Sequence, residues 1–215
     1  MERKAIFFDL DGTLTDSGEG ITNCAALALK HFGLPVPDKK ALGVFVGPPL
    51  RETFLKFGIK PEQIEEAVRV FRGRYTTVGK FENIPYPGIP ELLQTLKDHG
   101  HRLFVATSKP EVTALEIMEK FQLSPYFEKI CGATLDKSRD SKSSVIAYLL
   151  NTCAGISQAV MVGDTAFDVL GAAEHGIPTI GVAWGYGNVA EIQEAGAVSI
   201  AGTTQELLEL LENNT

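Results

Sequence analysis

The chain has 215 residues, of which 44% are hydrophobic and 22% are charged, and its formal net charge is −7. This length suits one large domain or a core with a smaller second domain, and the composition is that of an ordinary globular protein. A negative surface repels nucleic-acid backbones, so the charge disfavours DNA and RNA as partners. A small anionic substrate would need a local cationic site.

The cysteines and the start of the chain bear on the cellular compartment. Cys24, Cys131 and Cys153 are far apart and odd in number, so they indicate neither a disulfide framework nor a zinc site and favour a reducing environment. The apolar run after residue 4 is too short for a signal peptide, and no window is long enough to cross a bilayer. We therefore expect a cytoplasmic protein without a membrane partner.

Short apolar runs alternate with helical patterns along most of the chain. The runs at 5–8, 103–106, 159–162, 179–182 and 198–200 predict buried parallel strands. Apolar spacing predicts helices over 90–98, 111–121 and 143–150. This alternation predicts an α/β fold, with a three-layer, Rossmann-like core around a mostly parallel sheet.

Residues 16–82 break the alternation, because several helical patterns follow one another without an intervening strand. One apolar face runs from Ile21 to Phe32, and a second helix begins near Pro61, with Glu65 and Arg69 spaced to form an ion pair. We interpret 16–82 as an all-helical domain inserted into a core of residues 1–15 and 83–215. The alternative is that these helices pack on the sheet as ordinary crossovers.

Chemically active residues follow three of the expected strands. In an open parallel sheet, ligands bind beyond the carboxyl ends of the strands, so these residues have access to one edge of the sheet. The residues are Asp9 and Asp11 after the first strand, Thr107, Ser108 and Lys109 after the second, Asp164 and Asp168 after the third, and Lys142 at the start of a helical pattern.

Four carboxylates in one small site require compensation, because like charges and burial both disfavour ionisation. Mg²⁺ prefers oxygen ligands and also neutralises phosphate oxygens, so it meets this requirement. The hydroxyls and amides of Thr107 and Ser108, with a lysine, can hold an anion. Gly12 permits the tight turn that a chain leaving a strand beside a phosphate needs.

These segments resemble the motifs of the haloacid dehalogenase superfamily of hydrolases. "DLDGTLTDS" resembles the first motif, "FVATSKP" the second, Lys142 the lysine of the third and "VGDTAFD" the fourth. The helical insertion resembles the superfamily's helical cap. "GVAWGYGNVAEIQEAGA" is similar to the phosphoglycolate phosphatase-like branch, and "VGPPLRETF" to members called 5′-nucleotidases.

The resemblance implies a role for each matched residue. Asp9 is the nucleophile that becomes an aspartyl phosphate, and Asp11 protonates the leaving alkoxide and then deprotonates water, while its carbonyl faces the metal. Asp164 binds Mg²⁺ directly, and Asp168 belongs to the same metal site and orients the ion, directly or through water. Thr107 and Ser108 bind the phosphoryl group, and Lys142 offsets the charge on Asp9 and on phosphate.

The function implied by the resemblance is Mg²⁺-dependent hydrolysis of a small phosphomonoester, with phosphoglycolate or a nucleoside 5′-monophosphate as the leading candidates. Asp11 favours ester hydrolysis over dehalogenation, because a halide leaves without a proton. A phosphomutase of the same superfamily, a phospho-acceptor switch and a binding protein on an inactive scaffold remain alternatives. The expected partner is a small phosphorylated metabolite, and the chain is a monomer or a homodimer.

Several residues near the motifs carry plainer expectations. The alternative to a site role for Lys142 is a solvated lysine in a loop. The alternative for Asp168 is an exposed carboxylate on a helix. Lys109 is expected to be a surface charge or a charge that contacts the site residues from outside. Trp184 is expected to be a packing residue near a loop hinge. We assign no catalytic role to the four histidines.

Overall fold

The computed structural model describes residues 3–136 and 138–213. The chain forms two compact units: one contains the residues up to Thr15 and those from Pro85 onward, and the other is Asp16–Ile84. The boundaries fall within β2 (Thr15–Asp16) and β3 (Ile84–Pro85), the short strands of a separate two-stranded sheet.

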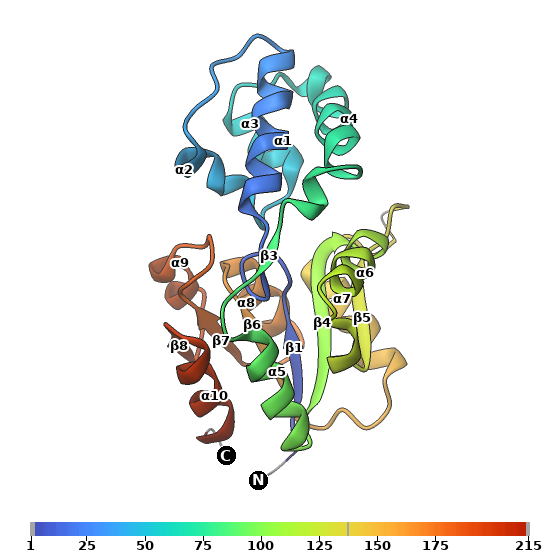
Figure 1. Cartoon of the computed structure of the whole chain (residues 1–215), viewed down its shortest axis with the longest axis vertical. Helices are drawn as coiled ribbons and strands as arrows, with labels where there is room; N and C mark the ends of the chain where they lie inside the picture. Colours follow the sequence, from blue (N-terminus) through green and yellow to red (C-terminus); the bar gives the residue numbers. More distant parts are fainter. Residues whose placement is uncertain (1–2, 137, 214–215) are drawn as a thin grey trace. The chain divides into compact units, whose positions relative to one another are not determined.

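The first unit contains a six-stranded sheet in the order β5-β4-β1-β6-β7-β8, with every described pair parallel (Figure 1). Its strands are β1 (Ala5–Phe8), β4 (Arg102–Pro110), β5 (Lys129–Ala133), β6 (Ala159–Gly163), β7 (Thr179–Val182) and β8 (Ser199–Ala201). The predicted α/β fold with a mostly parallel sheet is therefore confirmed.

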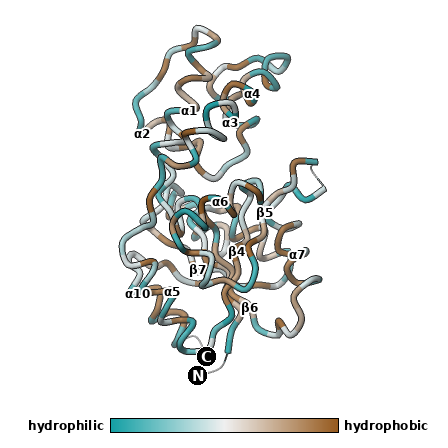
Figure 2. The backbone as a smooth tube through the Cα atoms, turned by 45° about the vertical axis from the view of Figure 1, so that its right-hand side comes forward, coloured by the Kyte–Doolittle hydropathy of each residue, from teal (hydrophilic) through white to brown (hydrophobic). Residues whose placement is uncertain are grey.

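Alternating side chains of β1 explain the three layers. Ile6 and Phe8 face one side of the sheet and Phe7 the other, because side chains point to opposite faces of a strand in turn. The first side is covered by α5 (Ile89–Asp98), α6 (Glu111–Lys120) and α10 (Thr204–Asn213), and the second by α7 (Lys142–Thr152) and α8 (Ala166–Ala173). Both faces are buried, which accounts for the mainly apolar strands drawn in brown in Figure 2.

Three strands differ from the sequence predictions. The second strand does not end at Ala106 but continues to Pro110, with an irregular register against β5 beyond Ala106. β5 was not predicted, because its sequence KICGA begins with a lysine and contains a glycine in only five residues. β8 lies one residue later than the predicted 198–200.

The second unit is built from helices around its own core. It contains α1 (Gly18–His31), α2 (Lys39–Leu42), α3 (Leu50–Lys56) and α4 (Ile64–Tyr75), with 3-10 turns at Gly43–Phe45, Pro61–Gln63 and Gly79–Phe81. Phe54 packs edge to face against Phe45 and Phe71, and all three rings are buried.

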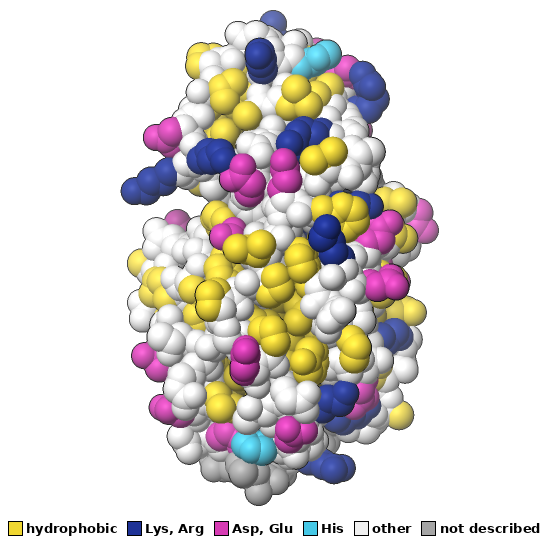
Figure 3. Space-filling model, in the orientation of Figure 1, with side chains coloured by type: hydrophobic (Ala, Val, Ile, Leu, Met, Phe, Trp, Pro, Cys, Tyr) yellow, Lys and Arg dark blue, Asp and Glu magenta, His cyan; other side chains and the backbone are white. Residues whose placement is uncertain are grey.

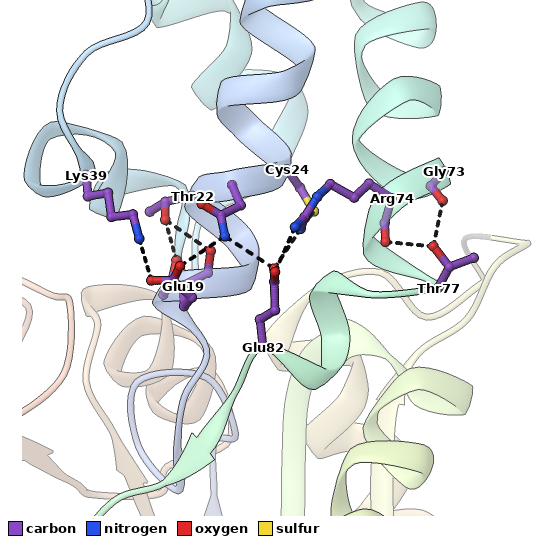
Figure 4. Close-up of polar contacts among 10 residues, drawn as sticks. Glu19, Thr22, Cys24, Lys39, Gly73, Arg74, Thr77 and Glu82 are labelled. Atoms are coloured by element: carbon purple, nitrogen blue, oxygen red, sulfur yellow. Dashed lines mark hydrogen bonds and ion pairs between the residues drawn. The ribbon is translucent and has the colours of Figure 1, made fainter.

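A polar network joins α1, α4 and the end of this unit (Figure 4). Arg74 donates to both carboxylate oxygens of Glu82 at 2.6 and 2.7 Å, and also contacts the Cys24 thiol at 3.5 Å. These bonds are bidentate and partly buried, so they are stronger than an exposed ion pair. Gly20 lies so close to Gly79 that a side chain there would overlap its carbonyl oxygen.

The predicted Glu65–Arg69 pair is wrong. Arg69 instead binds Glu66, with an Nε–Oε2 distance of 2.8 Å, and Glu65 binds Arg51 of α3, with an Nη2–Oε2 distance of 2.7 Å. Helical spacing allows Arg69 to pair with either Glu65 or Glu66. The contact of Glu65 with Arg51 joins two helices, so spacing along one helix does not reveal it.

The surface and the helices bear on possible membrane contact. Among the described residues, no helix combines the length and apolar character needed to cross a membrane. On the face drawn in Figure 3, acidic and basic side chains are interspersed rather than gathered by sign.

Candidate active site

The site forms where the direction of the sheet connections reverses. β1 lies between β4 and β6, so the chain crosses to one side for β4 and to the other for β6. Such a reversal opens a crevice at the carboxyl ends of the strands. Asp9 stands there directly after β1, with its amide donating to the Val162 carbonyl at 2.9 Å.

Lys142 joins two of the expected carboxylates. Its ammonium group lies 2.6 Å from Oδ1 of Asp9 and 2.7 Å from Oδ1 of Asp168, and donates to the carbonyl of Ala106 at 2.8 Å. The lysine is at the first position of α7, where Ser141 caps the helix by accepting from the amide of Ser144. Lys142 is therefore a buried member of the site and not a solvated loop lysine.

The ion pairs control the protonation of Lys142. Burial alone would lower the pKa of its amine, but the carboxylates of Asp168 and Asp9 outweigh burial and raise that pKa above its usual value. Lys142 therefore stays charged beside Asp9 across the physiological pH range.

Asp168 is fully buried, so the alternative of an exposed helix carboxylate is wrong. Its Oδ2 accepts from the amide and the hydroxyl of Thr165 at 3.0 and 2.8 Å, which caps the first turn of α8, and its Oδ1 faces Lys142. Burial raises the pKa of Asp168, Lys142 opposes the rise, and Asp9 adds to it. Both oxygens thus have protein partners, which suits a residue that orients Lys142 and Asp9.

Asp164 has a different environment, because its partners are uncharged donors. Thr13 donates its hydroxyl to Oδ1 at 3.3 Å, and the amides of Tyr186 and Gly187 donate to Oδ2 at 2.8 and 3.4 Å. Burial, followed by repulsion from Asp168 and Asp9, raises the pKa of this carboxyl well above its ordinary value. A cation beside Asp164 would reverse this and keep the carboxylate ionised.

Asp11 is paired with Lys109, which follows Thr107 and Ser108 after the second predicted strand. The ammonium group of Lys109 lies 2.8 Å from Oδ2 of Asp11, and both side chains are buried. The alternative of a surface charge for Lys109 is therefore wrong, whereas that of a charge that contacts the site residues from outside agrees with its pairing to Asp11. At the end of β4, Thr107 is buried, Ser108 exposed and Lys109 buried, so Lys109 lies on the same side of the strand as Thr107. Extension of the predicted strand beyond residue 106 would have given this period of two.

Two of the three expected phosphate-binding residues, Thr107 and Ser108, lie in the last part of β4. The Thr107 hydroxyl accepts from the amide of Lys109 at 3.2 Å and is buried, whereas the side chain of Ser108 is exposed. A role for Ser108 would thus depend on its backbone or on an exposed hydroxyl.

The carboxylates could hold a metal ion. One oxygen from each of Asp9, Asp164 and Asp168 lies within 4.8 Å of the others. With all groups ionised, the four aspartates and the two lysines leave a charge of −4 + 2 = −2. In addition, Oδ1 of Asp11 is buried without a hydrogen-bond partner among the described residues. A divalent cation fits this charge and this set of oxygen ligands.

The loop after β7 was not assigned to the site from sequence. Its residues Tyr186 and Gly187 bind Asp164 through their amides, and Trp184 donates its indole N–H to the Thr13 carbonyl at 3.1 Å. Backbone amides leave no residue-type signature, which is why the sequence did not reveal them. Trp184 also packs against Tyr86, as expected, with ring centroids 6.4 Å apart.

Comparison with known proteins shows the family to which the chain belongs. The family model described as haloacid dehalogenase-like hydrolase matches residues 6–182. The chain is similar to a 5′-nucleotidase of Pseudomonas aeruginosa, with 40% identity over 97% of this chain and 96% of the relative. It is also similar to the tyrosine-protein kinase PtkA of Mycobacterium tuberculosis, with 44% identity over 96% of this chain and 72% of the relative.

A solved structure supports the same assignment over nearly the whole chain. The crystal structure of a predicted phosphatase from Clostridium acetobutylicum has a TM-score of 0.92 and 40% identity, and covers 99% of both chains. The family model alone spans well over half of the chain. The chain therefore belongs to the haloacid dehalogenase-like hydrolase family.

Proposed function

We propose that this chain is a phosphatase that hydrolyses a small phosphomonoester through an aspartyl phosphate on Asp9, with Mg²⁺ as cofactor. The observation that carries the proposal is that Asp9 pairs with Lys142 at 2.6 Å and Asp11 pairs with Lys109 at 2.8 Å, both just after β1. Two carboxylates two residues apart thus have separate cationic partners, which suits two separate roles.

Asp9 acts as the nucleophile in this proposal. An Oδ atom of Asp9 attacks phosphorus, and the bond from phosphorus to the ester oxygen breaks as the new bond forms. Lys142 keeps Asp9 ionised and in place, and Thr107 offers its hydroxyl to a phosphoryl oxygen. Ser108 is the remaining candidate for phosphoryl binding.

Asp11 moves the protons. It gives its proton to the leaving alkoxide in the first step and takes one from the water that attacks the aspartyl phosphate in the second. Water attacks phosphorus, so the second step returns Asp9 as a free carboxylate and releases inorganic phosphate. Lys109 holds Asp11 at the place where both transfers occur.

Asp9, Asp164 and the carbonyl of Asp11 would hold Mg²⁺, and Asp168 would orient them. When bound, the ion offsets the negative charge of the carboxylates and of the transferred phosphoryl group. The support for this part is the excess of carboxylates over lysines in the site and the burial of Asp164, whose hydrogen-bond donors are uncharged.

The substrate is a small phosphomonoester, and we propose a nucleoside 5′-monophosphate first and phosphoglycolate second. The similarity to a named 5′-nucleotidase over nearly the whole chain favours the nucleotide. The inserted helical residues, 16–82 by sequence, are proposed to select among substrates.

Phosphate release from p-nitrophenyl phosphate and from a panel of phosphorylated metabolites tests the proposal. Asp9→Asn is expected to abolish turnover with an unchanged circular dichroism spectrum, because an amide is not a nucleophile at phosphorus. Asp136→Asn is the matched control, because Asp136 lies in an exposed loop after β5 and bonds to Ser138. Near-normal turnover by Asp9→Asn would remove Asp9 as the nucleophile.

Metal removal is a second arm of the same test. EDTA is expected to stop phosphate release and added Mg²⁺ to restore it, whereas undiminished turnover in EDTA would defeat the cofactor assignment. A phospho-acceptor switch would instead retain its phosphoryl group and turn over little.

Transfer to a tyrosine hydroxyl is the second candidate function, because the relative named tyrosine-protein kinase is 44% identical. An aspartyl phosphate can pass its phosphoryl group to a hydroxyl in place of water. Incubation with ATP and a tyrosine peptide distinguishes the two, since phosphopeptide formation that depends on Asp9 would favour the transferase.

A further inference from the structure

Two loops bind the Asp164 carboxylate, each through a different oxygen. The loop after β7 supplies the amides of Tyr186 and Gly187 to Oδ2, at 2.8 and 3.4 Å. The turn after β1 supplies the hydroxyl of Thr13 to Oδ1, at 3.3 Å. The direction of the Asp164 oxygens therefore depends on how these two loops lie relative to each other.

Trp184 connects the two loops directly. Its indole Nε1 donates to the backbone carbonyl of Thr13 at 3.1 Å, and its ring lies against Tyr86. Thr13 is thus bound twice, since its carbonyl accepts from Trp184 and its hydroxyl donates to Asp164. Displacement of Trp184 would release the turn and the hydroxyl together.

Close packing makes the arrangement sensitive to small shifts. A side chain at Gly12 or at Gly185 would overlap Oδ2 of Asp164, and one at Gly187 would overlap the Asp164 carbonyl oxygen. The two loops therefore meet around this carboxylate with no room for a Cβ atom, and a shift of either loop moves the Asp164 oxygens relative to Asp9.

We propose that Trp184 is a positioning residue for the divalent cation, because its indole fixes the loop after β7 to the turn after β1 and so aims Asp164 at Asp9. The proposal rests on the cation site of the proposed function but not on its substrate or turnover. The chain has one tryptophan, so its fluorescence is expected to report cation binding at Asp164.

Trp184→Phe is the direct test, because phenylalanine keeps an aromatic ring and removes the indole N–H. Isothermal titration with MgCl₂, without substrate, is expected to give a dissociation constant raised about tenfold or more, as outer partners of metal ligands usually give. Phosphate release by the variant is expected to recover as the Mg²⁺ concentration is raised.

Leu208→Ala is the matched control. Leu208 packs on the same core from α10, so its truncation lowers stability without touching either loop. An unchanged Mg²⁺ dissociation constant for Trp184→Phe, or an equal rise for Leu208→Ala, would overturn the proposal. Absence of Mg²⁺ binding to the wild type would overturn it as well.

Tryptophan emission gives a second readout that a purely structural role would not produce. The wild-type emission is expected to change saturably with Mg²⁺, at the concentration that calorimetry gives, and Asp164→Asn is expected to remove the response. Mg²⁺ binding in calorimetry with unchanged tryptophan emission would contradict the proposed coupling between Trp184 and the cation site. If the wild type binds Mg²⁺ but hydrolyses no ester, the proposed function fails and this inference still stands.

Discussion

The ammonium group of Lys109 lies 2.8 Å from Oδ2 of Asp11, and both side chains are almost completely buried. A buried carboxylate without a counter-charge is costly, and so is a buried ammonium group. Each residue therefore makes the burial of the other tolerable, and the pair fixes Asp11 next to the proposed nucleophile.

Replacement of Lys109 by methionine is expected to destabilise the chain. Lys109→Met leaves the Asp11 carboxylate without its cation, and loss of one partner of a buried pair costs about 3 kcal/mol. Urea unfolding monitored by circular dichroism measures the change.

The double variant Lys109→Met/Asp11→Asn is the control for this prediction. It removes both charges, so it is expected to be more stable than Lys109→Met alone. A single variant as stable as the wild type would show that the pair contributes little.

Gly12 is expected to tolerate no side chain, for a reason beyond its backbone angle. Gly12 and Gly176 both have positive φ, +82° and +67°, so alanine strains the backbone by about 1 kcal/mol at either position. At Gly12 the added methyl group also overlaps Asp164, whereas nothing lies within 4 Å of the same position at Gly176. Gly12→Ala is therefore expected to lose phosphate release and Mg²⁺ affinity.

Gly176→Ala is the matched variant, expected to lose only a small amount of stability. Parallel assays of phosphate release and thermal unfolding compare the two proteins. Equal activity losses in both would mean that backbone strain, and not contact with Asp164, accounts for the Gly12 effect.

His101 is expected to make stability fall as the pH falls. Burial lowers the pKa of its imidazole from 6.5, partly opposed by Glu212, and its Nδ1 accepts from the Lys4 amide at 3.2 Å. Below pH 6.5 the unfolded chain binds a proton that the folded chain resists, so the stabilisation is complete above this pH and declines below it.

The variant His101→Asn is expected to flatten this decline. Free energies of unfolding from urea titrations between about pH 7.5 and 5.5 give the slope, to which one histidine adds at most about 1.4 kcal/mol per pH unit. The same slope in wild type and variant would show that other groups cause the pH dependence.

Sequence alone identified much of this fold because the patterns were long or repeated. The apolar run 5–8 is β1 as expected, and the helices at 90–98, 111–121 and 143–150 agree with α5, α6 and α7 within two residues at either end. β5 was not predicted, because the five residues KICGA include a lysine and a glycine and are too few to show a period.

In the candidate site, the side chains could be predicted from the sequence, whereas the backbone groups and several of the contacts could not. Residue type and motif order predicted Asp9, Lys142, Asp164 and Asp168 as members of one site, and the structure brings these four side chains together. The resemblance also implied the contact of Lys142 with Asp9, but it did not imply the contacts of Lys142 with Asp168 and of Lys109 with Asp11, which join separate elements. The amides that bind Asp164 come from the backbone, which any sequence supplies.

Formation of an aspartyl phosphate on Asp9 is the central claim, and chemical trapping tests it most directly. Borohydride reduces an acyl phosphate to an alcohol, so treatment during turnover followed by peptide mass spectrometry should find homoserine at position 9, only when substrate is present. Homoserine at position 11 or 164 instead, or none at position 9 while phosphate is being released, would contradict the account.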